Sequence, residues 1–196
     1  MKLLAAAAFL IPVARPAYAA QTFSIVALGD SLTAGYGLPP QDAFTTRLQQ
    51  RLTANGLNVE VVNAGVSGDT SKGGLARIDW SVPDGTGLVI VELGANDALR
   101  GISPAETAKN LDAIIVRLKQ RGIGVLLAGM LAPPSMGSDY ETAFNAIYPG
   151  LAAKHDVPLY PFFLDGVVAD PKLNQADGMH PNAAGTDVII ERLSPV

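Results

Sequence analysis

Five short apolar runs, separated by segments with helical patterns, constrain the fold of this chain more than any other feature. The runs cover residues 22–28, 57–62, 88–93, 125–130 and 159–163. Each is a continuous apolar stretch rather than a strict alternation, which is typical of strands covered on both faces. Strands that alternate with helices pair in parallel through right-handed crossovers. The sequence therefore predicts an α/β fold: a three-layer α/β/α sandwich around a mainly parallel, flavodoxin-like sheet of about five strands.

Helical segments are predicted between these runs. The clearest begins at Ser103, which can cap it while Glu106 completes a capping box, and Gly122 ends it. Pro149 is expected to kink or break a helix whose apolar positions lie within 140–151. Two further helices are predicted, over 44–52 and from residue 182 or 183 to about 193.

The first twenty residues have the layout of a secretory signal peptide. An apolar stretch at 3–13 is followed by the small-x-small sequence Ala17-Tyr18-Ala19. We expect cleavage after Ala19 or Ala20, which assigns 1–20 to the signal peptide and 21–196 to one domain, periplasmic or secreted. The stretch is shorter than the roughly 20 residues of a membrane-spanning helix, so no stable membrane insertion is expected. An N-terminal helix packed on the domain is the alternative.

Composition excludes several classes of function. The formal net charge is -4 and there is no run of Lys or Arg, which argues against nucleic acid as a partner. The absence of cysteine excludes thiol nucleophiles and cysteine-ligated metals, and two histidines are too few for a three-histidine zinc site. No metal site of either kind is therefore expected.

Four loops rich in glycine and small polar residues follow the predicted strands or precede the last helix. Functional groups of open α/β sheets gather beyond the carboxyl ends of the strands, so these loops should converge on one rim. They cover residues 29–35, 63–69, 94–97 and 177–182.

These loops carry the groups that acyl transfer requires. Ser31 offers a nucleophilic hydroxyl, His180 a general base, and Asp177 a carboxylate that could orient the base. The backbone N–H groups of Ser31 and Gly65, with the side-chain amide of Asn96, are predicted to form the oxyanion hole. Glycine at 65 suits a close approach of the substrate to the backbone.

Each of these residues also has an ordinary structural interpretation. A loop serine such as Ser31 is often a turn residue or a helix cap, and Asn96 could be a left-handed turn residue. Asp30 and Asp97 are expected to bond to loop backbone through short local contacts. The second histidine, His155, lies near a predicted helix end, where a solvated histidine is expected rather than a base.

Taken together, the four loops resemble the four signature blocks of the SGNH (GDSL) hydrolase family. Ser31, Gly65 and Asn96 match the first three blocks, and Asp177 and His180 match the D-x-x-H of the last. The forms Gly-Asp-Ser-Leu-Thr-Ala-Gly-Tyr-Gly and Glu-Leu-Gly-Ala-Asn-Asp-Ala-Leu-Arg-Gly are most similar to the bacterial periplasmic thioesterase I and arylesterase branch. The resemblance implies hydrolysis of acyl thioesters, aryl esters or lysophospholipids without a cofactor.

The expected function is therefore a serine esterase that works through an acyl-Ser31 intermediate on a small-molecule acyl ester or thioester. A carbohydrate acetyl-esterase could use the same groups, and a non-catalytic binding protein on the same scaffold is the alternative from another class. We expect a monomer. Apolar residues after the third and fourth strands could line an acyl-chain groove or simply pack their loops. They are Leu99, Ile102, Leu131, Pro133, Pro134 and Met136.

Overall fold

The computed structural model describes residues 22–193, in which five parallel strands form one sheet. The strand order is β2-β1-β3-β4-β5, the flavodoxin-like order of doubly wound α/β proteins. The α/β class and the parallel sheet predicted from the sequence are both confirmed. The strands are β1 (Phe23–Gly29), β2 (Val59–Gly65), β3 (Leu88–Glu92), β4 (Gly124–Ala128) and β5 (Leu159–Tyr160). The predicted signal peptide lies outside the described residues.

The strand bounds differ from the predicted ones by one or two residues, and by three at the carboxyl ends of β2 and β5. β2 continues past Val62, because the backbone of 63–65 stays in register with β1 until Gly65 pairs with Gly29. β5 has only two residues instead of five, since Pro161 lacks the N–H that would continue the ladder. Both differences concern the carboxyl ends of strands, where the chain turns into the site loops.

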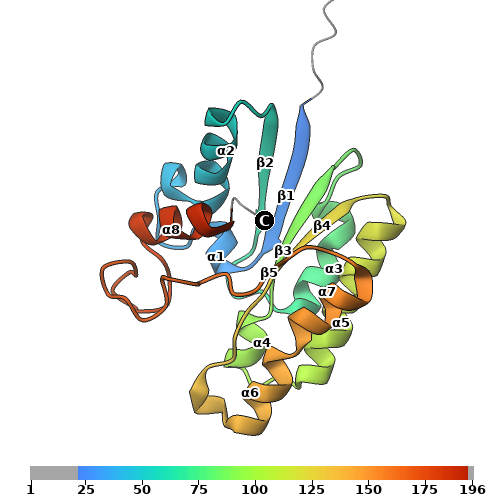
Figure 1. Ribbon diagram of the computed structural model, residues 1–196, viewed down its shortest axis with the longest axis vertical. Coiled ribbons are helices and arrows are strands. Elements are labelled where there is room, and N and C mark those ends of the chain that lie inside the picture. The colour runs from blue at the N-terminus through green and yellow to red at the C-terminus, as the bar shows by residue number, and fades with distance from the viewer. Residues whose placement is uncertain (1–21, 194–196) are drawn as a thin grey trace, which may run out of the picture.

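Helices cover both faces of the sheet (Figure 1). One face carries α1 (Ser31–Ala34), α2 (Phe44–Ala54) and α8 (Ala183–Leu193), and the other carries α3 (Ser71–Ser81), α5 (Pro104–Gln120) and α7 (Ile147–His155). The shorter helices are α4 (Ala95–Leu99), α6 (Ser138–Asn145), η1 (Pro40–Asp42) and η2 (Pro134–Met136). Within residues 22–193, no helix has the length and apolar character needed to cross a bilayer.

The predicted helices are present, but one predicted cap is wrong. Ser103 is the N-cap of α5, yet its side chain accepts no capping hydrogen bond. The N–H of Glu106 donates instead to the backbone carbonyl of Ser103, so no capping box forms. The break expected near Pro149 is confirmed, because α6 ends at Asn145 and Pro149 lies in the first turn of α7, where a missing N–H is tolerated.

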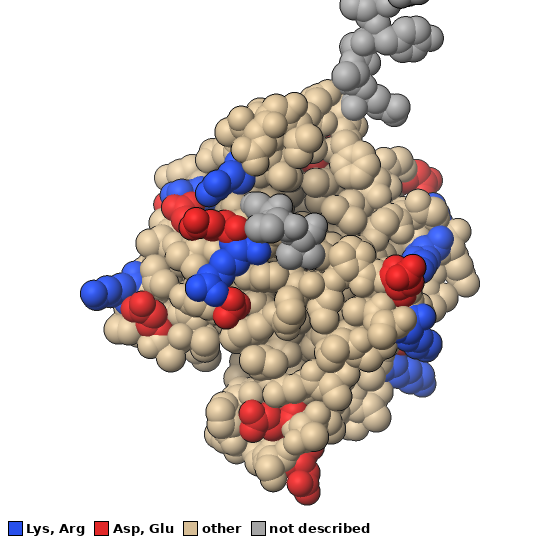
Figure 2. Space-filling model, in the orientation of Figure 1, with Lys and Arg blue, Asp and Glu red and all other residues tan. Residues whose placement is uncertain are grey.

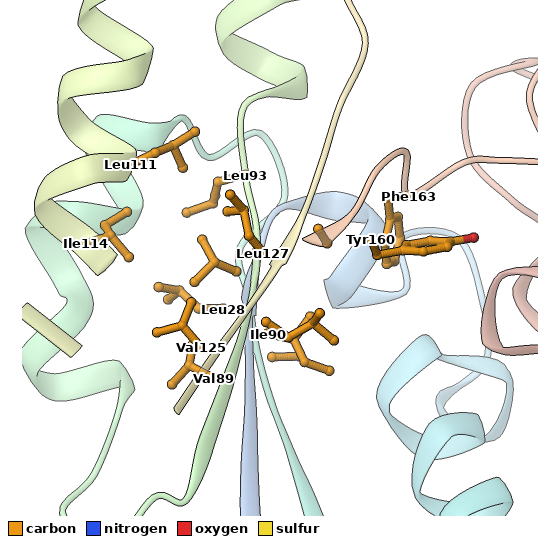
Figure 3. Packing of buried hydrophobic residues seen from close by; sticks show 14 of the residues in the cluster. Leu28, Val89, Ile90, Leu93, Leu111, Ile114, Val125, Leu127, Tyr160 and Phe163 are labelled. Atoms are coloured by element: carbon orange, nitrogen blue, oxygen red, sulfur yellow. The ribbon is translucent and has the colours of Figure 1, made fainter. Parts of the chain in front are cut away.

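The core is divided between the two faces of the sheet. Figure 3 shows Val89 and Ile90, which are successive residues of β3, on opposite sides. Leu28 and Val125 pack toward Leu111 and Ile114 of α5, and all four are fully or almost fully buried. Because both faces of β1, β3 and β4 are covered, these strands have the continuous apolar sequences from which they were predicted.

Candidate active site

The carboxyl ends of the strands open into a cavity of about 830 Å³. On one side it is bounded by the long loop between β5 and α8, and on the other by α4, η2 and α6 (Figure 1). The outline of the molecule is notched between these two parts, and acidic and basic side chains lie beside one another on the face shown (Figure 2). The cavity therefore lies at the rim on which the four loops were expected to converge.

Ser31 lies at this rim because β1 ends one residue before the turn that carries it. Asp30 caps the short helix α1, its Oδ1 accepting the N–H of Leu32 at 3.0 Å. Gly35 ends the helix with φ +78°, a conformation that favours glycine. Ser31 is thus both the first residue of a helix and part of the cavity wall. Its backbone N–H has no hydrogen-bond partner within residues 22–193.

His180 and Asp177 reach Ser31 from the loop that precedes α8. The Nε2 of His180 lies 2.9 Å from the Oγ of Ser31, and its Nδ1 lies 2.7 Å from the Oδ2 of Asp177. The carboxylate can only accept there, so Nδ1 carries the proton and Nε2 presents a lone pair to the serine. The ring of Tyr36 lies 4.7 Å from the His180 ring, centroid to centroid, and limits its rotation.

Asp177 is held as a carboxylate by its own loop. Its Oδ1 accepts the backbone N–H groups of His180 at 3.0 Å and Met179 at 2.9 Å. These backbone bonds, with the imidazole bond to Oδ2, lower the pKa of Asp177 to about 2. Asp177 is therefore charged throughout the neutral range and can stabilise a protonated His180.

Asn96 enters the cavity from the start of α4. Its Nδ2 donates to the Oδ2 of Asp30 at 2.9 Å. Because a carboxylate accepts hydrogen bonds, the nitrogen of the Asn96 carboxamide must face Asp30. The second N–H of this nitrogen remains available to donate to a substrate. The structure thus brings Ser31, His180 and Asn96 together in the lining of the cavity, with Asp177 bonded to His180.

The prediction for Gly65 needs a correction. Its N–H donates to the Oδ1 of Asn63 at 2.9 Å, and Gly65 is not among the residues that line the cavity. The glycine is needed for packing instead, since a Cβ there would lie 2.3 Å from the backbone nitrogen of Ala34. The close approach expected at this position is therefore made by α1 and not by a substrate.

Gly68, which the sequence did not single out, lines the cavity in its place. It lies in a turn closed by the N–H of Asp69 on the carbonyl of Val66, and its φ of +82° requires glycine. Within the described part of the chain, its N–H has no hydrogen-bond partner. The turn chemistry of Ser67-Gly68-Asp69 was the available signal, but two glycines three residues apart made the choice ambiguous.

Two buried carboxyl groups support the turn that carries Ser31. Glu92, at the end of β3, is fully buried, and its Oε2 accepts the N–H of Asp30 and the hydroxyl of Thr33 at 2.7 Å. Burial and the neighbouring Asp30 raise the pKa of Glu92 well above its usual value. Burial also raises the pKa of Asp30 to about 6, against the opposing bonds from Leu32 and Asn96. The environment of Glu92 therefore favours its protonated form.

Asp97 fixes α4, and so Asn96, to the rest of the fold. It is fully buried, and its Oδ2 accepts the backbone N–H of Ser71 at 2.8 Å. Its Oδ1 accepts the hydroxyl of Thr107 from α5 at 3.1 Å. The expected structural role is present, but the partners are on α3 and α5 instead of in the local loop. Asp30 does make the local contact that was expected, to Leu32.

The walls of the cavity are predominantly apolar. Leu99, Leu131, Pro133 and Pro134 line it, whereas Ile102 and Met136 do not. The opposite wall, which the sequence did not identify, comes from the loop before α8. Its apolar members are Phe162, Leu164, Val168 and Met179.

His155 lies apart from this group, at the end of α7. Its side chain is only 11% exposed, and its Nε2 lies 2.5 Å from the Oδ1 of Asp112 on α5. The expectation of a solvated histidine is therefore wrong, because the side chain is held between two helices. Its position does support the choice of His180 as the candidate base.

Comparison with known proteins identifies the family. The model of the GDSL-like lipase/acylhydrolase family matches residues 27–188. The chain is 42% identical to esterase TesA of Pseudomonas aeruginosa, over 90% of this chain and 88% of that protein. It is also 42% identical to thioesterase 1/protease 1/lysophospholipase L1 of Escherichia coli K12, over 89% of this chain and 82% of that protein.

A solved structure agrees with these relatives. The crystal structure of AlinE4, an SGNH-hydrolase family esterase, is 46% identical and superimposes with a TM-score of 0.78. The similarity covers 90% of this chain and 95% of AlinE4. The chain therefore belongs to the GDSL-like lipase/acylhydrolase family and is a carboxylic ester hydrolase.

Proposed function

We propose that the chain is a serine esterase that hydrolyses small acyl esters and thioesters through an acyl-Ser31 intermediate. The observation that carries the proposal is the continuous line of contacts from Ser31 Oγ to His180 Nε2 at 2.9 Å and from Nδ1 to Asp177 at 2.7 Å. Ser31 and His180 lie in the wall of an apolar cavity large enough for an acyl chain.

In the first half-reaction His180 accepts the proton of the Ser31 hydroxyl while Oγ attacks the acyl carbonyl carbon. The charge that develops on the carbonyl oxygen is stabilised by the N–H groups of Ser31 and Gly68 and by Nδ2 of Asn96. The C–O or C–S bond to the leaving group then breaks, and the leaving group takes the proton from His180. The acyl group stays on Ser31.

In the second half-reaction water attacks the acyl-Ser31 carbonyl, and His180 accepts a proton from it. The same three donors stabilise the second oxyanion. The bond to Oγ breaks, Ser31 recovers its proton from His180, and the carboxylic acid leaves. Asp177 keeps the imidazole in one tautomer and offsets its charge in both halves.

The apolar walls favour an apolar acyl group over an acetylated sugar, for which polar lining residues would be expected. The first test is hydrolysis of p-nitrophenyl esters and acyl-CoA thioesters of increasing chain length, with Ser31→Ala as control. A maximum at long chains would indicate a thioesterase or lysophospholipase, and a maximum at acetyl or butyryl a short-chain arylesterase. Turnover of acetylated sugars alone would support the carbohydrate acetyl-esterase instead.

Location and assembly form a second part of the proposal. We infer that residues 1–20 direct export and that 21–196 form the mature, periplasmic or secreted, monomeric enzyme. The mass of the protein recovered from the periplasm tests the first inference, because cleavage after Ala19 or Ala20 removes a defined set of residues. Light scattering of the purified enzyme tests the second.

A further inference from the structure

Arg77 of α3 is a buried charged residue that the mechanism above does not use. Its side chain is 7% exposed. Nε donates to Asp69 Oδ2 at 2.7 Å, Nη2 to the carbonyl of Gly29 at 2.8 Å, and Nη1 to the carbonyl of Ala64 at 2.7 Å. Nη1 also donates to the hydroxyl of Ser81, one turn further along the helix, at 3.1 Å.

Two of these four acceptors lie close in the chain to the backbone donors of the proposed oxyanion hole, and a third lies at the end of β2. Gly29 is the last residue of β1 and lies two residues before Ser31. Asp69 directly follows Gly68 and closes its turn. Ala64 is the next-to-last residue of β2 and pairs with Leu28 of β1. One guanidinium thus spans the ends of both strands and the loop that carries Gly68.

The carboxylate of Asp69 also packs against the backbone of α3. A Cβ at Gly73, in the first turn of α3, would lie 1.7 Å from the Oδ1 of Asp69. The Asp69 carboxylate therefore packs between the backbone of α3 and the guanidinium of Arg77. A planar guanidinium with donors in several directions can hold such a set of acceptors, whereas a lysine ammonium cannot reach all of them.

We propose that Arg77 is a positioning residue that holds the N–H groups of Ser31 and Gly68 at the spacing an oxyanion requires. The inference rests on the proposed function, in which these two groups stabilise the transition state. Arg77 does not touch the substrate. A displacement of about 1 Å in catalytic geometry can lower a rate by about 10²-fold, so loss of this contact should be visible in the kinetics.

A purely structural role for Arg77 would have a different kinetic signature. If the side chain only fastened α3 to the sheet, its replacement would lower the stability of the fold but leave the folded enzyme fully active. If it positions the two donors, its replacement weakens binding of the transition state more than binding of the substrate. The kcat should then fall while KM stays nearly constant.

The test uses the full mature enzyme with Arg77→Lys and Asp69→Asn. We would measure kcat and KM on a short p-nitrophenyl ester and the inhibition constant of an alkylboronic acid, whose adduct with Ser31 places a hydroxyl in the oxyanion hole. We expect Arg77→Lys to lower kcat by about 10- to 100-fold and to change KM by less than about 2-fold. The inhibition constant of the boronic acid should rise by the same factor by which kcat falls. Asp69→Asn keeps an acceptor for the Nε of Arg77, so its kcat should fall less than that of Asp69→Ala.

Arg121→Lys is the matched control. Arg121 is also a partly buried arginine, and it donates to the backbone carbonyl of Val82 at 2.7 Å. Both residues lie in loops that lead into strands, at the end of the sheet opposite to the cavity. Arg121→Lys should leave both kcat and the inhibition constant of the boronic acid unchanged. If Arg77→Lys does not fold, Asp69→Asn and Asp69→Ala decide the question with the same measurements.

Unchanged kcat and boronic acid affinity in the folded variants, with only a lower melting temperature, would overturn the proposal for Arg77. That result would leave the proposed function intact, because Ser31→Ala would still be inactive. If Ser31→Ala retained turnover, the proposed function itself would fail. The two failures are therefore distinguishable.

Discussion

The two sides of the active site are built in different ways. The side that carries the oxyanion donors rests on Asp30, Glu92 and Asp97, each 0% exposed and bonded to neighbouring strands or helices. The side that carries the base is a surface loop, in which the side chains of His180 and Asp177 are 18% and 33% exposed. The loop is ordered by bonds among its own residues, whereas the buried side is ordered by the fold.

This difference separates stability from catalysis. Removal of a buried hydrogen-bond partner leaves another buried polar group unsatisfied, which costs about 1–3 kcal/mol. In the exposed loop, water can replace a lost partner. Changes in the loop should therefore lower activity alone, and changes on the buried side should lower both activity and stability.

Replacement of the nucleophile or the base should have the largest effect. Ser31→Ala and His180→Ala should each lower kcat by about 10⁴- to 10⁶-fold, and the double variant should be scarcely worse, because the two groups act as a unit. The measurement is steady-state hydrolysis of a p-nitrophenyl ester, with melting temperatures for each variant. His155→Ala is the control: it should affect stability and leave kcat intact. A single variant with near-normal activity would contradict the assignment.

Asn96→Ala should lower both activity and stability, because Asn96 belongs to the buried side. We expect kcat to fall by about 10²- to 10³-fold, as for loss of one oxyanion donor. The Oδ2 of Asp30 would also lose its donor, and the free energy of unfolding should drop by about 1–3 kcal/mol. Urea unfolding beside the kinetics checks both effects. Loss of activity with full stability would mean that the contact with Asp30 is unimportant.

Asp177 should show the opposite behaviour. Asp177→Ala should lower kcat by about 10²-fold, with little change in melting temperature, since water can reach this loop. Asp177→Asn should be at least as damaging, because its side-chain amide would favour the wrong tautomer of His180. Kinetics of the two variants at equal pH make the comparison. Higher activity in Asp177→Asn than in Asp177→Ala would argue against the tautomer explanation.

The smallest effect is expected from the buried pair, and it concerns stability and pH. The pKa values of Glu92 and Asp30 are raised by folding, Asp30 from 3.8 to about 6. Their contribution to stability is therefore complete below about pH 4 and is lost as the pH rises through the raised pKa values. Glu92→Gln cannot ionise, so its free energy of unfolding relative to the wild type should increase from pH 5 to pH 8.

Urea unfolding at several pH values tests this prediction. Glu60→Gln, a change at an exposed residue of β2, is the control and should follow the wild type. A constant difference between Glu92→Gln and the wild type across this range would show that Glu92 does not titrate as its burial implies.

The same contrast explains which features were predictable from the sequence. The strands and the loops bearing Ser31, Asn96, Asp177 and His180 have local signals: apolar runs, small residues and a D-x-x-H spacing. The burial of Arg77 and Glu92 has no local signal, because a charged residue in a helix or at a strand end is usually exposed.

The two glycines near the end of β2 show the limit most clearly. Gly65 is the last residue of β2 and Gly68 lies in the turn that follows it, and both positions require glycine. Which N–H is available depends on a hydrogen bond from Gly65 to the side chain of Asn63 and on the packing of α1 against β2. These are tertiary contacts, so sequence spacing could not distinguish the two residues.

The proposed mechanism requires that the reaction pass through Ser31. The most direct test is to label the enzyme with a fluorophosphonate, locate the adduct by peptide mass mapping, and follow ester hydrolysis in the same samples. We expect one adduct per chain, on Ser31, with activity lost in proportion to labelling, and no adduct in Ser31→Ala. Full turnover by enzyme labelled at Ser31, or an inactivating adduct on another residue, would contradict it.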